Sequence, residues 1–293
     1  MNKNASKQLI NMVKAYNVDV ILLCDLPKVG FLPQLFNEQL NAKQNHTFYE
    51  NYALLDTHRR MSVFSKFDNT RFKVVDRYQF TQSKSWALSQ LAYFELVLPN
   101  KLESISLILA HLYSKTNKNK EDLLTNAKNV VNEIQQFEKY MGHEKTIIVG
   151  DFNANPFDEM MYRHDCFNAT MSSKTAEKKF LQIKDAGKFP YFYNPAWGLL
   201  GDLQKNVPAT FYFSPFTNEV LRDQISKNHH YFGWNMLDFV LLRADIIPYF
   251  EKSSFQILEN DGTDSASWVQ FIEEKTNKED HPDHLPIIFT LTF

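Results

Sequence analysis

The sequence has little glycine and almost no cysteine, with only 8 glycines and 2 cysteines among its 293 residues. It contains no Gly-x-Gly-x-x-Gly, Gly-x-x-x-x-Gly-Lys or Gly-x-Ser-x-Gly segment, which argues against a dinucleotide fold, a P-loop and a serine-hydrolase elbow. Two cysteines are too few for a zinc site of the cysteine type or a disulfide framework. We therefore expect Cys24 and Cys166 to be small buried thiols in a reducing compartment.

The sequence also lacks an excess of charge of one sign and any long hydrophobic run. Lys and Arg total 32 against 34 Asp and Glu, so the protein has no strongly basic footprint for holding nucleic acid by charge. No stretch approaches the roughly 18–20 apolar residues of a membrane helix, and the N-terminal segment lacks the apolar region of a signal peptide. These absences predict a soluble cytoplasmic protein without a membrane span.

What the sequence does have is apolar and aromatic residues, at 44% and 14%, which is enough for a large core. No repeat, Gly/Ser linker or low-complexity tract divides it, so we expect one domain over residues 1–293. Periodicity predicts helices at 5–16, 31–42, 120–142, 244–251 and 265–275, and strands at 18–24, 60–66, 72–78, 91–98, 104–112, 145–150, 236–243 and 285–293. Residues 154–235 are expected to be mostly loops with short strands. This order indicates an α/β fold.

Polar residues interrupt three apolar runs where a strand begins or ends. Asp25 follows VILLC, Asp151 and Asn153 follow TIIVG, and Asp283 and His284 precede LPIIF. Carboxylate oxygens are the ligands that Mg²⁺ prefers, and strand ends are where α/β folds place chemistry. Convergence of these carboxylates would make a site for a divalent cation.

Histidine is the side chain best suited to proton transfer near neutral pH, and His284 is the leading candidate. Asp238 lies inside the apolar run MLDFVLLR, where an unpaired charge would be costly, so it needs a partner that His284 can supply. Taken alone, each residue has a structural alternative. An Asp after a strand often caps a helix or forms a turn, and His111 in LILAHLYSK is by itself more typical of a core histidine. Their joint occurrence favours a site.

Four segments together resemble the endonuclease/exonuclease/phosphatase superfamily, whose fold is that of pancreatic-type deoxyribonuclease. In order along the chain they are HLYSK, IIVGDFNANP, MLDFVLLR and DHLPI. The segment FYNPAWGLLGD, with TFYF and WNMLDFVLLR after it, further resembles a poorly characterised bacterial branch. The resemblance implies a four-layer α/β sandwich, with two mixed sheets packed face to face, helices outside and the strand ends converging at one edge.

The resemblance also implies roles for these residues. His284 would be the general base that activates the attacking water, and Asp238 would orient it. Asp151 and Asn153 would position the nucleophile and the phosphoryl group, and His111 would hydrogen-bond the phosphate or assist the leaving group.

Asp25 and Asp283 would hold Mg²⁺ or Mn²⁺ by the same resemblance. The family has Glu where Asp25 stands, and because Asp is one methylene shorter, the ion must shift or a water must bridge the gap. The family also opens with a strand ending in Asn, whereas here the helix at 5–16 begins almost at once. We therefore expect the first strand of the fold to be missing and the true start to lie before Met1.

These residues predict a metal-dependent phosphoester hydrolase, most simply a phosphodiesterase or nuclease acting on DNA or RNA. Nuclease and phosphatase cannot be separated at this stage, because that choice lies in the loops around a shared site. Arg60, beside Arg59, is a candidate phosphate ligand, with a solvated surface cluster as the alternative. Trp197 and Trp234 could stack bases, although core packing is the more ordinary role. The alternative function is a fold relative that binds nucleic acid or a protein partner without turnover.

Overall fold

The computed structural model describes residues 3–27, 33–42, 47–54, 59–81, 90–98, 103–115, 118–201, 207–213, 233–263, 267–274 and 283–293. Its α-helices are α1 (Lys3–Ala15), α2 (Pro33–Ala42), α3 (Lys120–Met141), α4 (Glu159–Tyr162), α5 (Ser173–Ala176) and α7 (Trp268–Glu274). Short 3₁₀ helices are η1 (Arg77–Gln79), η4 (Pro195–Leu199), η6 (Ala244–Tyr249) and η7 (Lys252–Ser254).

A mixed sheet forms the centre of the molecule and has seven strands in the described part of the chain, in the order β4-β5-β6-β7-β14-β11-β8. Neighbouring strands are antiparallel except for the β6/β7 and β8/β11 pairs, which are parallel. The strands are β4 (Phe72–Val75), β5 (Leu91–Val97), β6 (Ser104–His111), β7 (Thr146–Asp151), β8 (Ala169–Thr170), β11 (Phe192–Tyr193) and β14 (Asp238–Leu242).

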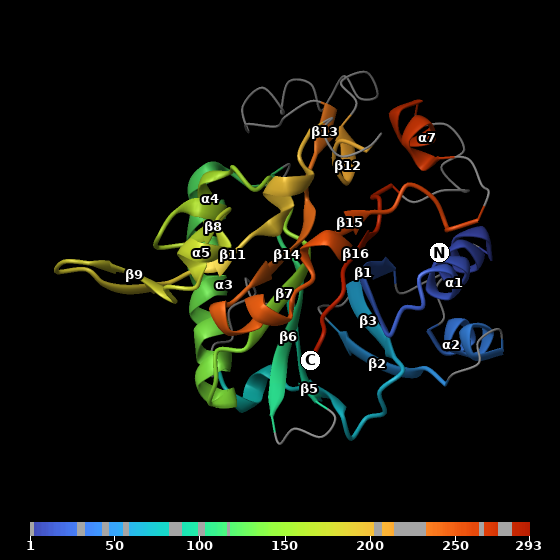
Figure 1. The fold of residues 1–293 in the computed structure, drawn as a ribbon, viewed down its shortest axis with the longest axis horizontal. Coiled ribbons are helices and arrows are strands. Elements are labelled where there is room, and N and C mark those ends of the chain that lie inside the picture. Colours follow the sequence, from blue (N-terminus) through green and yellow to red (C-terminus); the bar gives the residue numbers. More distant parts are fainter. Residues whose placement is uncertain are drawn as a thin grey trace.

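A second sheet has the order β1-β3-β2 and is antiparallel throughout its described strands, β1 (Val20–Pro27), β2 (Tyr49–Leu54) and β3 (Arg59–Ser65). It packs face to face with the larger sheet, because Met61 and Val63 of β3 share the main core with β5, β6 and β7. Its other face is covered by α1 and α2 through Ile10, Val13 and Phe36. Figure 1 shows the resulting layers, with α3 outside the large sheet and α1 and α2 outside the small one. The predicted α/β sandwich is confirmed.

Helix α3 shows why the layers pack as they do. Its apolar residues recur on one face, and the structure buries Ala127, Val130, Ile134 and Phe137 completely. Asn119 caps its start by accepting a hydrogen bond from the Asp122 N–H, at 2.8 Å. The chain leaves the helix at Gly142, whose φ of +72° suits a residue without a side chain. This helix carries the chain from the end of β6 to the start of β7, which lets those two strands run parallel.

Two segments, 285–293 and 244–251, differ from the sequence prediction. The segment 285–293 forms only the short β16 (Ile287–Ile288), paired with β15 (Gln256–Ile257), together with one isolated bridge between Phe250 and Leu291. Segment 244–251 is a 3₁₀ helix, in keeping with Pro248, which cannot donate a backbone hydrogen bond. Within 154–235 the described strands are short, as predicted. Besides β8 and β11 of the large sheet they are β9 (Phe180–Ile183) and β10 (Gly187–Pro190), which form a projecting hairpin (Figure 1), and β12 (Phe211–Phe213), which pairs with β13 (Gly233–Asn235).

None of the helices in the described ranges combines the length and apolar character required to cross a bilayer.

Candidate active site

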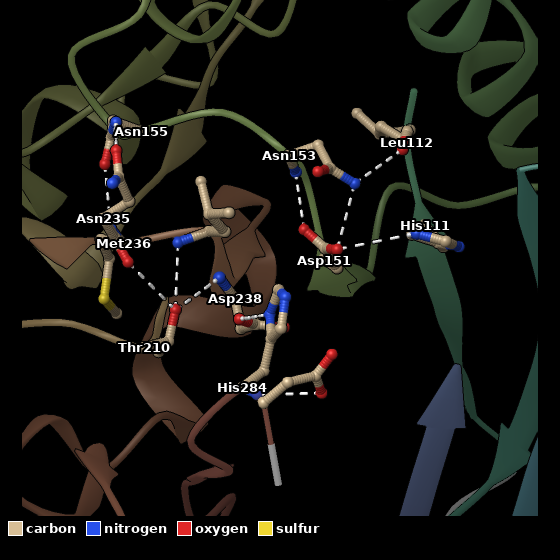
Figure 2. A network of polar contacts seen from close by, with 12 residues as sticks. His111, Leu112, Asp151, Asn153, Asn155, Thr210, Asn235, Met236, Asp238 and His284 are labelled. Atoms are coloured by element: carbon tan, nitrogen blue, oxygen red, sulfur yellow. Dashed lines mark hydrogen bonds and ion pairs between the residues drawn. The ribbon is translucent and has the colours of Figure 1, made fainter. Parts of the chain in front are cut away.

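Three of the predicted residues lie in one row, at the ends of three neighbouring strands in the middle of the large sheet. His111 ends β6 and is the register partner of Asp151 at the end of β7, and Asp151 is in turn the partner of Asp238 at the start of β14. Residues paired in this way across neighbouring strands point to the same face of a sheet. Strand pairing alone therefore brings together an imidazole and two carboxylates from residues 111, 151 and 238 (Figure 2).

Gly150 permits this close pairing of β6 and β7. Its φ of +142° is one that residues with a side chain rarely adopt, and a Cβ built there would lie 2.0 Å from the carbonyl oxygen of Ala110. The chain then turns sharply, because Asn153 has a φ of +49°, in the left-handed region that Asn tolerates better than most residues. The Gly-Asp-Phe-Asn segment is thus a strand end followed by a tight turn.

The turn folds Asn153 back onto Asp151. The Asn153 N–H donates to Asp151 Oδ1 at 2.7 Å, and Asn153 Nδ2 donates to Asp151 Oδ2 at 3.0 Å and to the carbonyl of Leu112 at 2.9 Å. On the other side of the carboxylate, His111 Nε2 lies 3.6 Å from Asp151 Oδ2. Both Asp151 and His111 are buried. Figure 2 shows Asp151 held between these two neighbours, so its orientation is fixed from both sides.

His284 reaches the row from the C-terminal segment. Its Nδ1 lies 2.7 Å from Asp238 Oδ2, so Asp238 has the partner that its place in an apolar run requires. An ionised carboxylate only accepts hydrogen bonds, so Nδ1 carries the proton of this contact, and Nε2 is the nitrogen left for other chemistry. Burial lowers the pKa of His284, but the charge and hydrogen bond of Asp238, with the charges of Asp151 and Asp283, outweigh burial and raise the pKa to about 10.

Two further contacts at this edge involve residues that the sequence did not single out. The Phe211 ring lies against the His284 ring, with centroids 4.6 Å apart. Asn155 Nδ2 donates to Asn235 Oδ1 at 2.9 Å, and Asn155 Oδ1 accepts the Met236 N–H at 2.9 Å, which ties the loop after Asp151 to the segment before Asp238. Asn155 belongs to the quoted motif GDFNANP, so the motif held a signal for it. Phe211 and Asn235 lie in the segments TFYF and WNMLDFVLLR, which contribute to the resemblance but gave neither residue a role.

A group of side chains that can hold a metal is present in the described part of the chain. Asp151, Asp238 and His284 each offer one ligand atom, and these atoms lie within 4.8 Å of one another. Asp283 is beside them, with an exposed side chain whose Oδ1 accepts the His284 N–H at 3.1 Å. Because these groups are mainly carboxylate oxygens, their chemistry fits a hard divalent cation such as Mg²⁺ or Mn²⁺. Asp151 is thus a candidate ligand besides the predicted Asp25 and Asp283, whereas the Asp238 carboxylate already accepts the His284 ring N–H.

The other predicted residues are placed only by their backbone. Asp25 lies in β1, at a register shift between Leu23 and Leu26, and this strand packs against β6 and β7. Arg60 lies in β3 and pairs with Leu26 of β1. The side chains of Asp25 and Arg60 lie outside the described part of the structure, so their predicted roles stay predictions.

Both candidate stacking residues contact other side chains of the protein. Trp197 packs edge-on against Phe157, and Trp234 packs against Tyr212 and donates its Nε1–H to Glu273 at 2.7 Å. These contacts agree with the packing alternative.

No family model and no curated protein matches the sequence. Solved structures do match over nearly the whole chain. An endonuclease/exonuclease/phosphatase family protein from Leptotrichia buccalis has a TM-score of 0.54 at 11% identity, covering 100% of this chain and 96% of that one. Truncated TDP2 from Caenorhabditis elegans has a TM-score of 0.52 at 13% identity, covering 100% and 93%. The 3′ phosphatase NExo from Neisseria, bound to a product DNA hairpin, has a TM-score of 0.51 at 9% identity, covering 98% and 94%. The chain has the fold of the endonuclease/exonuclease/phosphatase superfamily.

Proposed function

We propose that this protein is a metal-dependent phosphoester hydrolase, and specifically a phosphodiesterase of the nuclease type. The observation that carries the proposal is the hydrogen-bonded pair of Asp238 and His284 beside the Asp151 carboxylate. A carboxylate on one imidazole nitrogen fixes the tautomer and leaves the other nitrogen available for proton transfer. The fold supports the same class of reaction, since the similar structures include a 3′ phosphatase bound to product DNA.

In this reaction, His284 Nε2 takes a proton from a water molecule, and the water oxygen attacks phosphorus opposite the leaving oxygen. Asp238 holds the imidazole in place and stabilises the positive charge that it gains. Asp151 and Asn153, locked to each other, orient the water and the phosphoryl group. His111 contacts a phosphoryl oxygen or donates a proton to the leaving oxygen. Each role needs a side chain held in a fixed orientation, because this kind of hydrolysis is accelerated by positioning the reactants and by stabilising the charge of the transition state.

By the resemblance, the divalent cation would be held by Asp25 and Asp283, and Asp151, which groups with Asp238 and His284, is a further candidate ligand. When bound, it polarises the phosphoryl oxygen and stabilises the charge of the leaving oxygen. The carboxylates around His284 give a second reason for a bound cation. Asp151 and Asp283 help to keep His284 protonated, and a protonated imidazole cannot act as a base. Neutralising those carboxylates with a cation removes part of what raises the pKa of His284.

The test is hydrolysis of bis-p-nitrophenyl phosphate and plasmid DNA with Mg²⁺, with Mn²⁺ and with EDTA. We expect cation-dependent turnover in the wild type and its loss in His284→Ala. His164→Ala is the matched control, because His164 is an exposed histidine packed on the Phe189 ring and should leave turnover unchanged. Equal rates in wild type and His284→Ala would refute the assignment of the base.

The substrate is tested by a parallel panel of DNA, RNA, phospholipid and inositol phosphates. We expect the nucleic acids to be cleaved, and the Arg60→Ala variant to have a higher KM with little change in kcat if Arg60 contacts a phosphate. Tight binding of nucleic acid without cleavage, under every cation tested, would favour the non-catalytic alternative.

A further inference from the structure

Thr210, the first residue of the TFYF segment, is a buried residue to which the sequence gave no role, and its hydroxyl contacts the segment that carries Asp238. The residue is completely buried. Its Oγ1 accepts the Leu237 N–H at 3.0 Å and the Asp238 N–H at 3.1 Å. The same hydroxyl donates to the carbonyl of Asn235 at 3.5 Å. A hydroxyl offers one donor and two acceptor sites, so all three are used.

Thr210 also holds the segment that carries His284. Its carbonyl oxygen accepts the N–H of Leu285, the residue after His284, at 2.7 Å. The next residue, Phe211, forms an isolated bridge with His284 and lays its ring against the imidazole. One residue therefore bonds the backbone on both sides of the Asp238 and His284 contact. Figure 2 shows the bonds of its hydroxyl on the Asp238 side.

We propose that Thr210 is a positioning residue for the catalytic pair, its hydroxyl fixing the backbone of Asp238 so that the carboxylate meets Nδ1 of His284. The inference rests on the proposed function, since it assigns a role within the same site. It is a specific role, because Asp238 is the first residue of β14. Before it, the Leu237 carbonyl accepts the Phe152 N–H at 2.8 Å, but the N–H groups of Leu237 and Asp238 both donate to the Thr210 hydroxyl. The Thr210 hydroxyl thus takes the place of a sheet partner for two successive N–H groups.

A second buried threonine provides a control of the same chemistry. Thr146 is also completely buried, in β7 of the same sheet, but its hydroxyl has no hydrogen-bond partner among the described residues. Thr→Val keeps the shape of the side chain and removes only the hydroxyl. At Thr146 the change removes an unsatisfied polar group, whereas at Thr210 it removes the acceptor of two backbone donors.

The experiment compares T210V, T210S and T146V by steady-state hydrolysis of bis-p-nitrophenyl phosphate. Outer partners of site residues typically alter activity by about 10–100-fold when removed. We expect T210V to lower kcat by about that factor with KM little changed, T210S to restore most of it, and T146V to match the wild type. T210A against T210S gives a second pair that differs by the hydroxyl alone, which covers the case in which T210V does not fold.

A readout independent of turnover is the Nδ1–H proton resonance of His284 in the ¹⁵N-histidine-labelled, cation-free protein at one fixed pH. We expect a strongly downfield, hydrogen-bonded proton in wild type, T210S and T146V, and its upfield shift or loss in folded T210V or T210A. An unchanged resonance in a folded variant without the hydroxyl would overturn the proposal. If the wild type hydrolyses no substrate, the proposed function fails, and the resonance still decides whether Thr210 positions the pair.

Discussion

Replacing Gly150 with alanine should separate β6 from β7 at the site and destabilise the fold. The new Cβ would lie 2.0 Å from the Ala110 carbonyl oxygen, which is backbone and cannot rotate away, and alanine would also have to adopt a φ of +142°. Backbone strain of this kind costs about 1–3 kcal/mol, and forcing extra volume into a packed interior costs about 1–3 kcal/mol more. The expected loss of about 2–6 kcal/mol is a large part of a typical domain stability of about 5–15 kcal/mol.

Urea unfolding followed by circular dichroism measures this loss, with Gly142→Ala as the control. Gly142 also has a positive φ, of +72°, but a Cβ there meets nothing within 4 Å, so the expected cost is that of the backbone alone, about 1–2 kcal/mol. Because Gly150 precedes Asp151, any relief of the clash also moves Asp151 away from His111, and kcat should fall even where the variant folds. A Gly150→Ala protein as stable as Gly142→Ala and fully active would refute the close-approach argument.

Four further predictions concern other residues of the molecule. Arg243→Met should destabilise the protein by about 3–5 kcal/mol, because it leaves the buried Glu138 carboxylate without its bidentate partner, and an unchanged urea midpoint would contradict this. Burial, reinforced by the charge of Asp165, raises the pKa of the Cys166 thiol to about 11, so a C24S variant should resist thiol labelling by DTNB at pH 8 until it is unfolded. Because the pKa of Cys166 is raised in the folded state, its contribution to the free energy of unfolding should decrease as pH rises from about 8.5, the unfolded value, to about 11. Urea midpoints measured over that pH range test this decrease. Asp238→Asn should lower kcat by about 10–100-fold without a comparable change in KM, and a normal kcat would remove Asp238 from the pair.

Much of the site could be predicted because its residues carry local signals. Asp151 and Asn153 stand where a buried apolar run breaks off, and Asp238 is a charge inside such a run, so each was visible without a structure. The same chemistry predicted the partner of Asp238, because a buried carboxylate needs a cation or a donor, and His284 supplies it at 2.7 Å. Helix α3 was predictable for a similar reason, since its apolar stripe and Gly142 are local features.

Other features depended on contacts between distant segments. The C-terminal run LPIIFTLTF has the composition of a long strand, but only Ile287 and Ile288 find a ladder partner, since a strand needs a neighbour as well as a propensity. The hairpin of β9 and β10 was expected only as unspecified short strands, because the β9 sequence Phe-Leu-Gln-Ile has no regular alternation of apolar and polar residues.

The sequence by itself determined which residue types lie at the strand ends, and therefore the class of chemistry that we propose. Only the tertiary structure decided that His111, Asp151 and Asp238 share one row, because strand order and register depend on long-range pairing that no local pattern encodes. Only the tertiary structure showed that the Thr210 hydroxyl accepts two backbone N–H groups, those of Leu237 and Asp238. Side-chain chemistry is local, but the alignment of these groups is a property of the assembled sheet.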